Sequence, residues 1–382
     1  MSFLRLSLLA VLFSYCTAAA MGQKIKEPAL STVGMTTRAF VDTARRDWQN
    51  LGPRPLNTVI WYPAAAGFAA KPFVATAENA AFFGDPTFGK FFAPISVAFD
   101  APPLITSQKH PLILLSHGST SLGLELMWLG YFLASHGYIV AAVNHHGNTA
   151  AEGRLLPQGF ILEWERPEDI KATLTKLLAD PVFGKQIDHV RTGAAGHSAG
   201  GTTVIQLAGA IFNSSALITY CNSPQSKSDG TCEPREAIQQ SLAKLEELKK
   251  TDPVVQESVR HGGESHRDPR VKAVFAMAPA IGPAFTEQGL SAINIPVQIV
   301  VGDADDIAPM TTNASHFAKF IKGAKLTLLP HVGHMTFGSE CTPLGKESLD
   351  GCRDTSEVDR AAIQRQVEKQ VLAFFESVWI TQ

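Results

Sequence analysis

One serine, a group of aspartates and two histidines give this 382-residue chain the residue types that nucleophilic catalysis needs. Ser198 comes first, the aspartates follow within residues 303–306, and the histidines lie within residues 331–334. Serine is a weak nucleophile until a histidine takes its proton, and a carboxylate fixes the imidazole tautomer and stabilises the imidazolium. These residues therefore predict cleavage of an acyl group by a Ser-His-Asp triad.

Ser198 lies in the pattern Gly196-His197-Ser198-Ala199-Gly200, which follows the apolar run 190–195 and precedes the helix-compatible run 202–208. A G-x-S-x-G pattern between a strand and a helix is typical of a nucleophile elbow, where the serine hydroxyl is exposed at the top of a sheet. Glycines two positions before and after the serine fit a turn that leaves no room for a Cβ atom. We therefore predict that Ser198 is the nucleophile.

The base and the acid have alternatives on the same loops. His334 follows a glycine after the last predicted strand and is the favoured base, with His331 as the alternative. The order Ser, Asp, His is that of α/β-hydrolases. Residues 302–309, GDADDIAP, resemble the G-x-x-D-x-[IV]-[VA]-P loop common in that superfamily. That resemblance selects Asp305 as the acid, with Asp303 next.

Two backbone N–H groups are predicted to form an oxyanion hole. One belongs to Ala199, directly after the nucleophile, and the other to Ser119, directly after His117-Gly118. Such donors stabilise the charge that develops on the carbonyl oxygen in the tetrahedral state. We interpret His117 as a structural support of this loop rather than as a second base.

Strands and helices alternate along most of the chain, and this alternation must position the candidate residues. The expected strands are apolar or β-branched runs at 36–42, 56–62, 112–115, 138–143, 190–195, 271–278, 297–301 and 324–329. The expected helices cover 124–135, 167–178, 202–208 and 358–379. This alternation predicts an α/β protein with a mostly parallel central sheet flanked by helices, in an α/β-hydrolase fold.

Two segments interrupt the alternation. Residues 63–110 are rich in phenylalanine, including Phe82, Phe83, Phe88, Phe91, Phe92 and Phe99, and are expected to cover the core, or alternatively to line an apolar substrate pocket. Residues 213–268 are polar and include one predicted amphipathic helix from about Pro234. One such helix cannot bury a core of its own, so we expect residues 21–382 to form a single domain in which residues 213–268 are a lid insertion.

Residues 1–20 resemble a secretory signal, with Arg5, the apolar run 6–13 and three alanines at 18–20. No other run is long and apolar enough to cross a membrane, so the mature protein is expected to be exported, either periplasmic or secreted. Cleavage removes Cys16 and leaves four cysteines, which permit three pairings. The local pairs Cys221–Cys232 and Cys341–Cys352 are favoured because each closes a polar loop that contains glycine.

Charge and motifs exclude several other function classes. The 33 Lys and Arg against 35 Asp and Glu give a net charge of −2 without a long run of one sign, which argues against nucleic acid as a partner. His145 and His146 have no third ligand at metal-binding spacing, so no metal is expected. No glycine-rich phosphate loop or dinucleotide fingerprint is present, so no cofactor is expected.

Several blocks resemble one known group of hydrolases. Residues 116–118 and 133–145 look like the oxyanion-loop block of platelet-activating-factor acetylhydrolases and of the related bacterial predicted dienelactone hydrolases. Residues 54–63, 166–169 and 196–201 fit the bacterial group. Dienelactone hydrolases use a cysteine nucleophile where this chain has Ser198. In the animal enzymes the acid follows the strand after the elbow, where this chain has the uncharged residues 277–280.

The sequence therefore predicts a serine hydrolase that cleaves small-molecule carboxylic esters through an acyl-enzyme. Amide or peptide cleavage with the same triad is the alternative, because both reactions need the same groups. A hydrolase fold retained as a binding protein is a third hypothesis, which the presence of all three triad residue types disfavours.

Overall fold

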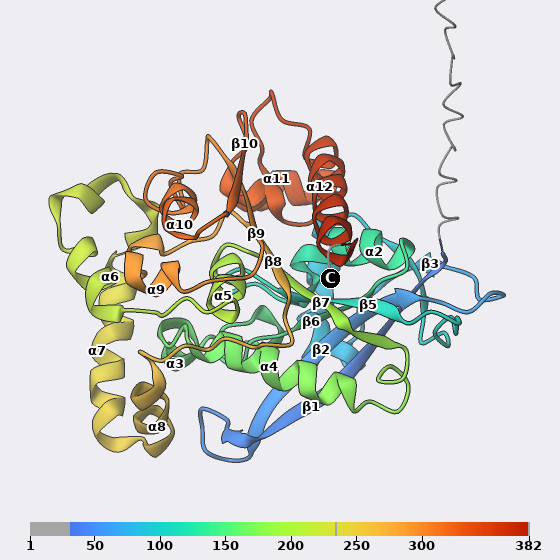
Figure 1. The fold of residues 1–382 in the computed structure, drawn as a ribbon, viewed down its shortest axis with the longest axis horizontal. Helices are drawn as coiled ribbons and strands as arrows, with labels where there is room; N and C mark the ends of the chain where they lie inside the picture. The colour runs from blue at the N-terminus through green and yellow to red at the C-terminus, as the bar shows by residue number, and fades with distance from the viewer. Residues whose placement is uncertain (1–30, 234, 381–382) are drawn as a thin grey trace, which may run out of the picture.

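The computed structural model describes residues 31–233 and 235–380, so the predicted signal segment 1–20 lies outside the described residues. Within them, ten strands form one sheet in the order β10-β9-β8-β7-β5-β6-β2-β1-β4-β3 (Figure 1). The strands are β1 (Val33–Arg46), β2 (Pro53–Pro63), β3 (Lys71–Pro72), β4 (Ser96–Phe99), β5 (His110–Ser116), β6 (Ile139–Val143), β7 (Ile187–His197), β8 (Ala273–Met277), β9 (Val297–Gly302) and β10 (Lys325–Leu329).

Strands β5 to β10 form the parallel part of the sheet, and β1 and β2 add an antiparallel hairpin beside β6. Every residue of β5, β6 and β8 is buried, as expected for apolar strands covered on both faces. The predicted mostly parallel sheet is confirmed.

The register of the parallel strands brings their carboxyl ends to one edge. Ser116 at the end of β5 pairs with Gly196 of β7 and Val143 of β6, and His197 pairs with Met277 of β8. Gly302 at the end of β9 pairs with Leu329 of β10. The loops that follow these strands therefore meet at one edge, where open α/β sheets gather their functional groups.

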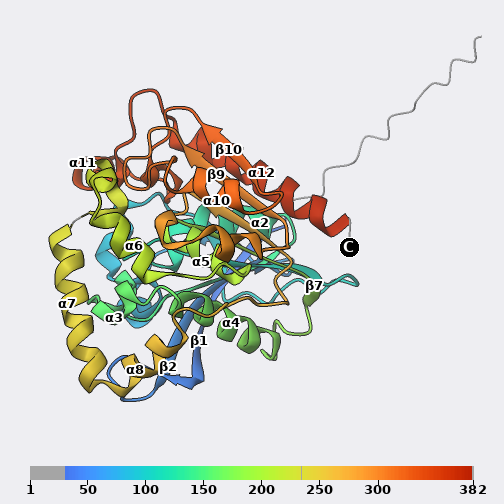
Figure 2. The ribbon, with the colours of Figure 1, turned by 60° about the vertical axis from the view of Figure 1, so that its left-hand side comes forward.

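Twelve α-helices lie in the described residues. They are α1 (Ala80–Phe83), α2 (Met127–Ser135), α3 (Pro157–Ile161), α4 (Glu165–Leu178), α5 (Ala199–Leu207), α6 (Ser214–Cys221), α7 (Arg235–Thr251), α8 (Pro253–His261), α9 (Glu287–Ser291), α10 (Ala314–Phe320), α11 (Pro343–Ser348) and α12 (Arg360–Ile380). Helices α2 and α12 pack together on one face of the sheet, and α4 and α5 pack together on the other (Figures 1 and 2).

The phenylalanine-rich segment 63–110 covers the core. Phe83 is buried, and Phe73, Phe82 and Phe92 pack on the main core cluster. None of the described residues of this segment lines the cavity at Ser198. The segment also adds the short strands β3 and β4 beside β1, with β3 at the edge of the sheet, which the sequence did not predict.

Residues 213–268 hold α6, α7 and α8, which lie together at one side of the molecule (Figure 2). The sequence predicted one helix here, and α7 corresponds to it. Both local disulfides predicted from the sequence are present, Cys221–Cys232 with a Cα–Cα distance of 5.5 Å and Cys341–Cys352 with one of 5.8 Å. Each bond closes a loop beside the carboxyl edge of the sheet. No helix in the described part of the chain combines the length and hydropathy of a membrane span.

Candidate active site

Ser198 occupies a strained turn between β7 and α5. Its backbone has φ 55° and ψ −124°, a conformation that L-residues rarely adopt. A Cβ atom on Gly196 would collide with the carbonyl oxygen of Gly200, and one on Gly200 would collide with the carbonyl oxygen of Ser116. The two glycines thus let the elbow approach β5 closely, and the surrounding structure maintains the strained backbone of Ser198 at the carboxyl edge of the sheet.

Asp305 and His334 are brought into direct contact by the loops after β9 and β10. The Nδ1 of His334 donates to Oδ2 of Asp305 at 2.8 Å, and both side chains are buried. The other carboxylate oxygen of Asp305 accepts from the backbone N–H groups of Ile307 at 3.1 Å and Ala308 at 2.7 Å. Three donors therefore fix the orientation of the carboxylate.

The charge state of His334 suits a general base. Burial lowers the pKa of its imidazole, the hydrogen bond to Asp305 opposes that shift, and the net pKa lies below the ordinary histidine value. The ring is then neutral at pH 7, with its proton on Nδ1 toward Asp305 and its Nε2 free to accept a proton.

The alternatives Asp303 and His331 lie elsewhere. Oδ1 of Asp303 accepts from the backbone N–H of His331 at 2.6 Å, so this carboxylate holds the turn itself. The exposed ring of His331 lies 3.1 Å from the carboxylate of Glu357. Of the sequence alternatives, the structure pairs Asp305 with His334.

His197, the residue before Ser198, contacts His334. Nε2 of His197 lies 3.0 Å from the carbonyl oxygen of His334, and the two imidazole rings are 4.8 Å apart. The Ser198 hydroxyl makes no hydrogen bond to the His334 ring among the described residues, so the catalytic pairing of the two stays a prediction. Catalytic hydrogen bonds are often long in structures without substrate.

Glu125 is a site residue that the sequence reasoning missed. Its Oε1 lies 2.8 Å from Nδ1 of His197, and its Oε2 accepts from the backbone N–H of Gly118. Burial alone would raise the pKa of this carboxyl, but His197 and the Gly118 N–H hold it below its usual range. Glu125 thus links the oxyanion loop to the elbow. A lone carboxylate inside the apolar run 122–133 was the available signal, because a buried charge must be paired.

The oxyanion loop leaves the predicted donors free. Gly118 N–H is bound to Glu125, and Thr120 N–H donates to Asn148 Oδ1 at 2.6 Å. The backbone N–H of Ser119, which lies between these two residues, donates to no group within residues 31–233 and 235–380. The backbone N–H of Ala199 also has no acceptor within these residues. Both residues line the same cavity as Ser198. This arrangement can present two donors to an oxyanion.

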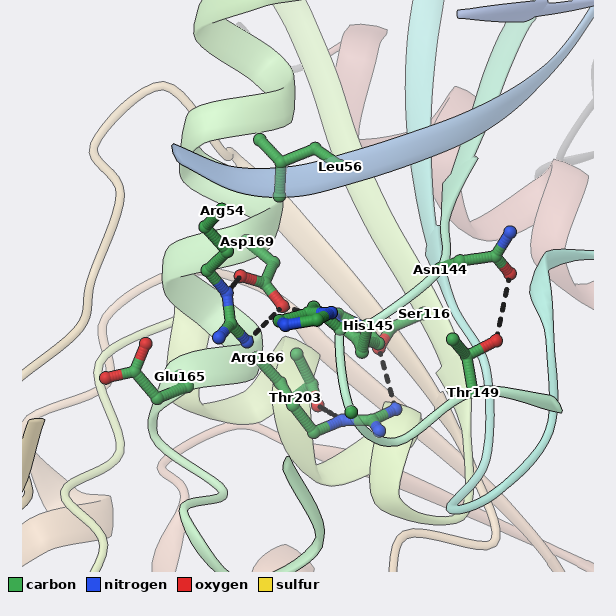
Figure 3. A network of polar contacts seen from close by, with 12 residues as sticks. Arg54, Leu56, Ser116, Asn144, His145, Thr149, Glu165, Arg166, Asp169 and Thr203 are labelled. Atoms are coloured by element: carbon green, nitrogen blue, oxygen red, sulfur yellow. Dashed lines mark hydrogen bonds and ion pairs between the residues drawn. The ribbon is translucent and has the colours of Figure 1, made fainter. Parts of the chain in front are cut away.

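A buried polar network packs against the oxyanion loop, residues 117–120, and connects it to β2 and α4 (Figure 3). Asp169 Oδ2 lies 3.0 Å from Nδ1 of His145, whose Nε2 lies 2.9 Å from the Ser116 hydroxyl. Arg54 Nε donates to the other oxygen of Asp169 at 2.7 Å. Arg166 donates to the carbonyl oxygen of His117.

His117 acts as the predicted support, since its Nε2 accepts from the backbone N–H of His145 at 3.1 Å. Burial first, and the positive charge of Arg166 second, lower the pKa of His145 to about 3. The ring is therefore neutral, while Arg54 and Arg45 hold the pKa of Asp169 well below its usual range against the effect of burial. The network joins β2, α4 and the loops after β5 and β6 in fixed protonation states.

The second histidine of the pair considered for metal binding is also engaged. His146 Nδ1 lies 2.8 Å from Glu152 Oε1, and its Nε2 accepts from the Trp48 backbone N–H at 3.2 Å. In the described ranges, no three His, Cys, Asp or Glu side chains are grouped so as to hold a metal ion.

A cavity of about 860 Å³ opens beside Ser198. Its walls are mostly apolar, and α6, α7 and α8 with their connecting loops supply one side of it. The lining includes Phe160, Trp164, Phe212, Leu217, Leu242, Leu245 and Ile281. A cavity of this size and character can hold a small apolar substrate next to the serine.

Comparison with known families supports the resemblance seen in the sequence. Residues 86–181, about a quarter of the chain, match the family described as platelet-activating factor acetylhydrolase, isoform II. This range contains β5, α2, β6 and the oxyanion loop.

Two curated relatives each match over 49 residues. Over these residues the chain is 49% identical to the platelet-activating factor acetylhydrolase of Cavia porcellus and 45% identical to that of Canis lupus familiaris. In both cases the match covers 13% of this chain and 11% of the relative. The chain thus matches about a tenth of the length of these relatives.

Among solved structures, the ferulic acid esterase from Streptomyces cinnamoneus superposes with a TM-score of 0.61 at 23% identity. The superposition covers 91% of this chain and 89% of that chain. The chain therefore has an α/β-hydrolase fold.

Proposed function

We propose that this protein is a serine hydrolase that cleaves carboxylic esters through an acyl-enzyme. The observation that carries the proposal is the hydrogen bond between Asp305 and His334 at the carboxyl edge where Ser198 occupies its strained turn. The similarity to acetylhydrolases and to an esterase supports an ester as the substrate class.

The proposed reaction follows from the groups at this edge. Ser198 Oγ attacks the ester carbonyl carbon as its proton passes to His334 Nε2, while Asp305 stabilises the imidazolium. The N–H groups of Ser119 and Ala199 bind the oxyanion. Collapse of the tetrahedral intermediate breaks the ester bond, and the alcohol leaves with the proton from His334. Water then attacks the acyl-enzyme, with His334 again as base, and releases the acid and Ser198.

We also propose that residues 21–382 form one domain, in which residues 213–268 are a lid over the cavity. Two disulfides are typical of proteins that work in an oxidising compartment, which supports export.

Labelling with a fluorophosphonate, followed by mass spectrometry of the adduct, tests the nucleophile. We expect the adduct on Ser198 and turnover of short-chain nitrophenyl esters, with Ser198→Ala as the inactive control. The absence of both adduct and turnover would refute the enzyme and favour a binding protein. Turnover of matched nitroanilides at the rate of the esters would instead favour an amidase.

A further inference from the structure

Glu163 is a buried carboxylate in the wall of the cavity that contains Ser198. It lies between α3 and α4, is 8% exposed, and lines the cavity together with Ser119, Ser198 and Ala199. Its Oε2 is fully buried on the side of Arg166 and has no hydrogen-bond partner. Its Oε1 likewise accepts no hydrogen bond from a described residue, but it is not sealed off from the cavity. Buried polar groups are rarely left in this state, so Oε1 is the acceptor that a ligand in the cavity can reach.

The nearest cation does not satisfy this carboxylate. Arg166 Nε is 3.9 Å from Oε2, which is beyond hydrogen-bond distance. That N–H donates instead to the Thr203 hydroxyl at 3.0 Å, and another N–H of the same guanidinium donates to His117 O. Arg166 thus supplies positive charge nearby without occupying the acceptor positions of Glu163.

The buried wall beside Glu163 is apolar. Trp164 and Phe212 are buried, with their rings 5.6 Å apart, and Leu245 of α7 is also buried. The Trp164 indole N–H is already bound to the Ser258 carbonyl oxygen at 2.9 Å, so it offers no donor to the carboxylate. A ligand that fits here is apolar over most of its surface and carries a hydrogen-bond donor where it meets Glu163.

Resting on the proposed function, we propose that Glu163 accepts a hydrogen bond from a hydroxyl group of the substrate, and that the preferred substrates are otherwise apolar esters bearing such a hydroxyl away from the scissile bond. The positive charge of Arg166 makes a neutral donor a better fit than an ammonium group. Burial raises the pKa of Glu163 to about 7, against the effect of Arg166, and in either charge state a carboxyl oxygen can accept a hydrogen bond from the hydroxyl group.

Matched ester pairs test the proposal. Nitrophenyl esters whose acyl chains end in a hydroxyl are compared, over a series of chain lengths, with chains that end in a methyl group of similar size. Acetate esters of the corresponding diols and alcohols examine the alcohol side. We expect kcat/KM to favour the hydroxylated member by roughly 10- to 100-fold at one chain length, the range for one hydrogen bond to a charged group.

Two variants assign this preference to Glu163. Glu163→Gln keeps a neutral acceptor and should reduce the preference, while Glu163→Met removes the acceptor and should reverse it toward the methyl-terminated ester. Glu247→Gln is the matched control, because Glu247 lies on α7 outside the cavity lining with a 65% exposed side chain. This control should keep the wild-type preference.

The outcomes separate this inference from the proposed function. If no ester is turned over, the proposed function fails. If esters are turned over without a preference for the hydroxylated members, the inference alone fails. A wild-type preference for ammonium-terminated over hydroxyl-terminated chains would also overturn it. So would a Glu163→Met variant that loses thermal stability but keeps the preference, because that result indicates a structural role beside Arg166.

Discussion

Replacing Asp305 by asparagine should disable the proposed base through a forced change of tautomer. Oδ1 of Asp305 accepts two backbone N–H groups, from Ile307 and Ala308. The asparagine carbonyl oxygen must keep that position, so its NH₂ group faces His334 Nδ1 in place of the carboxylate oxygen. The NH₂ group can only donate, so the imidazole proton moves to Nε2. Nε2 of His334 then has no lone pair with which to accept the proton of Ser198.

The expected loss can be worked from the same contact. Asp305 and the imidazolium of His334 have charge centres about 4 Å apart, which gives about 4 kcal/mol at an effective dielectric constant of ~20. That energy corresponds to roughly 10³ in rate, and the wrong tautomer brings the loss in kcat to about 10³–10⁴. Because the exchange is nearly isosteric, KM should change little.

The assay is nitrophenyl ester turnover at neutral pH, together with the rate of fluorophosphonate labelling of Ser198. Circular dichroism melting confirms that the variant is folded. Asp303→Asn is the matched control, since Asp303 binds the His331 backbone on the surface turn, and it should keep most of the activity. Near-normal kcat in folded Asp305→Asn, or loss of activity in Asp303→Asn alone, would refute the reasoning.

Four further predictions concern strain, pH and the disulfides. Ser198→Gly should be inactive yet more stable than Ser198→Ala by about 1 kcal/mol in urea unfolding, because glycine tolerates a φ of 55° without strain; equal stability of the two variants would contradict this. The acid limb of kcat/KM should lie below the ordinary histidine value of about 6.5, because the pKa of His334 is lowered and the neutral base persists to lower pH. A limb above that value would refute the assignment. Replacing both Cys341 and Cys352 by serine should cost about 3 kcal/mol of unfolding free energy, as the chain-entropy model gives for so short a loop, whereas an unchanged denaturation midpoint would show that this loop is held without the bond. Finally, His145 has a pKa of about 3 in the folded state, so the unfolded chain takes up a proton below about pH 6.5 and the folded chain does not. Stability should therefore fall with decreasing pH from about 6.5 to 3, and His145→Gln should show a shallower slope in urea titrations at several pH values.

The parallel core and the loops that hold the candidate site residues could be predicted from the sequence, because patterns of neighbouring residues indicate them. Strands β6 and β8 are continuous apolar runs, β5 contains such a run at 111–115, and the residues that can do chemistry follow the ends of strands. The limits of β1 were less readable, since it extends to Arg46 past an irregularity after Asp42, where the sequence turns polar. Strands β3 and β4 were not predicted, because they are too short to show a periodic hydrophobic pattern and are stabilised by pairing near the edge of the sheet.

The parts of the site that sequence reasoning missed depend on contacts between distant residues. Glu125 meets His197 across 72 positions, and Arg54 meets Asp169 across 115. No local pattern marks such pairs, although Glu125 is a lone carboxylate within the apolar run 122–133. Glu163 belongs to the same class, because α7 and α8, from a later part of the chain, supply one side of the cavity that it lines.

The buried network beside the oxyanion loop also shows a limit of recognising catalytic triads from residue types and hydrogen bonds. Ser116, His145 and Asp169 repeat, with hydrogen bonds of 2.9 and 3.0 Å, the residue types and connectivity of a catalytic triad. All three are sealed from solvent, and burial, together with the positive charge of Arg166, lowers the pKa of His145 so that the ring stays neutral. A template search on residue types and hydrogen bonds would thus return this buried set. Access to the serine distinguishes it from the candidate site, because Ser116 is fully buried whereas Ser198 is partly exposed and lines the cavity.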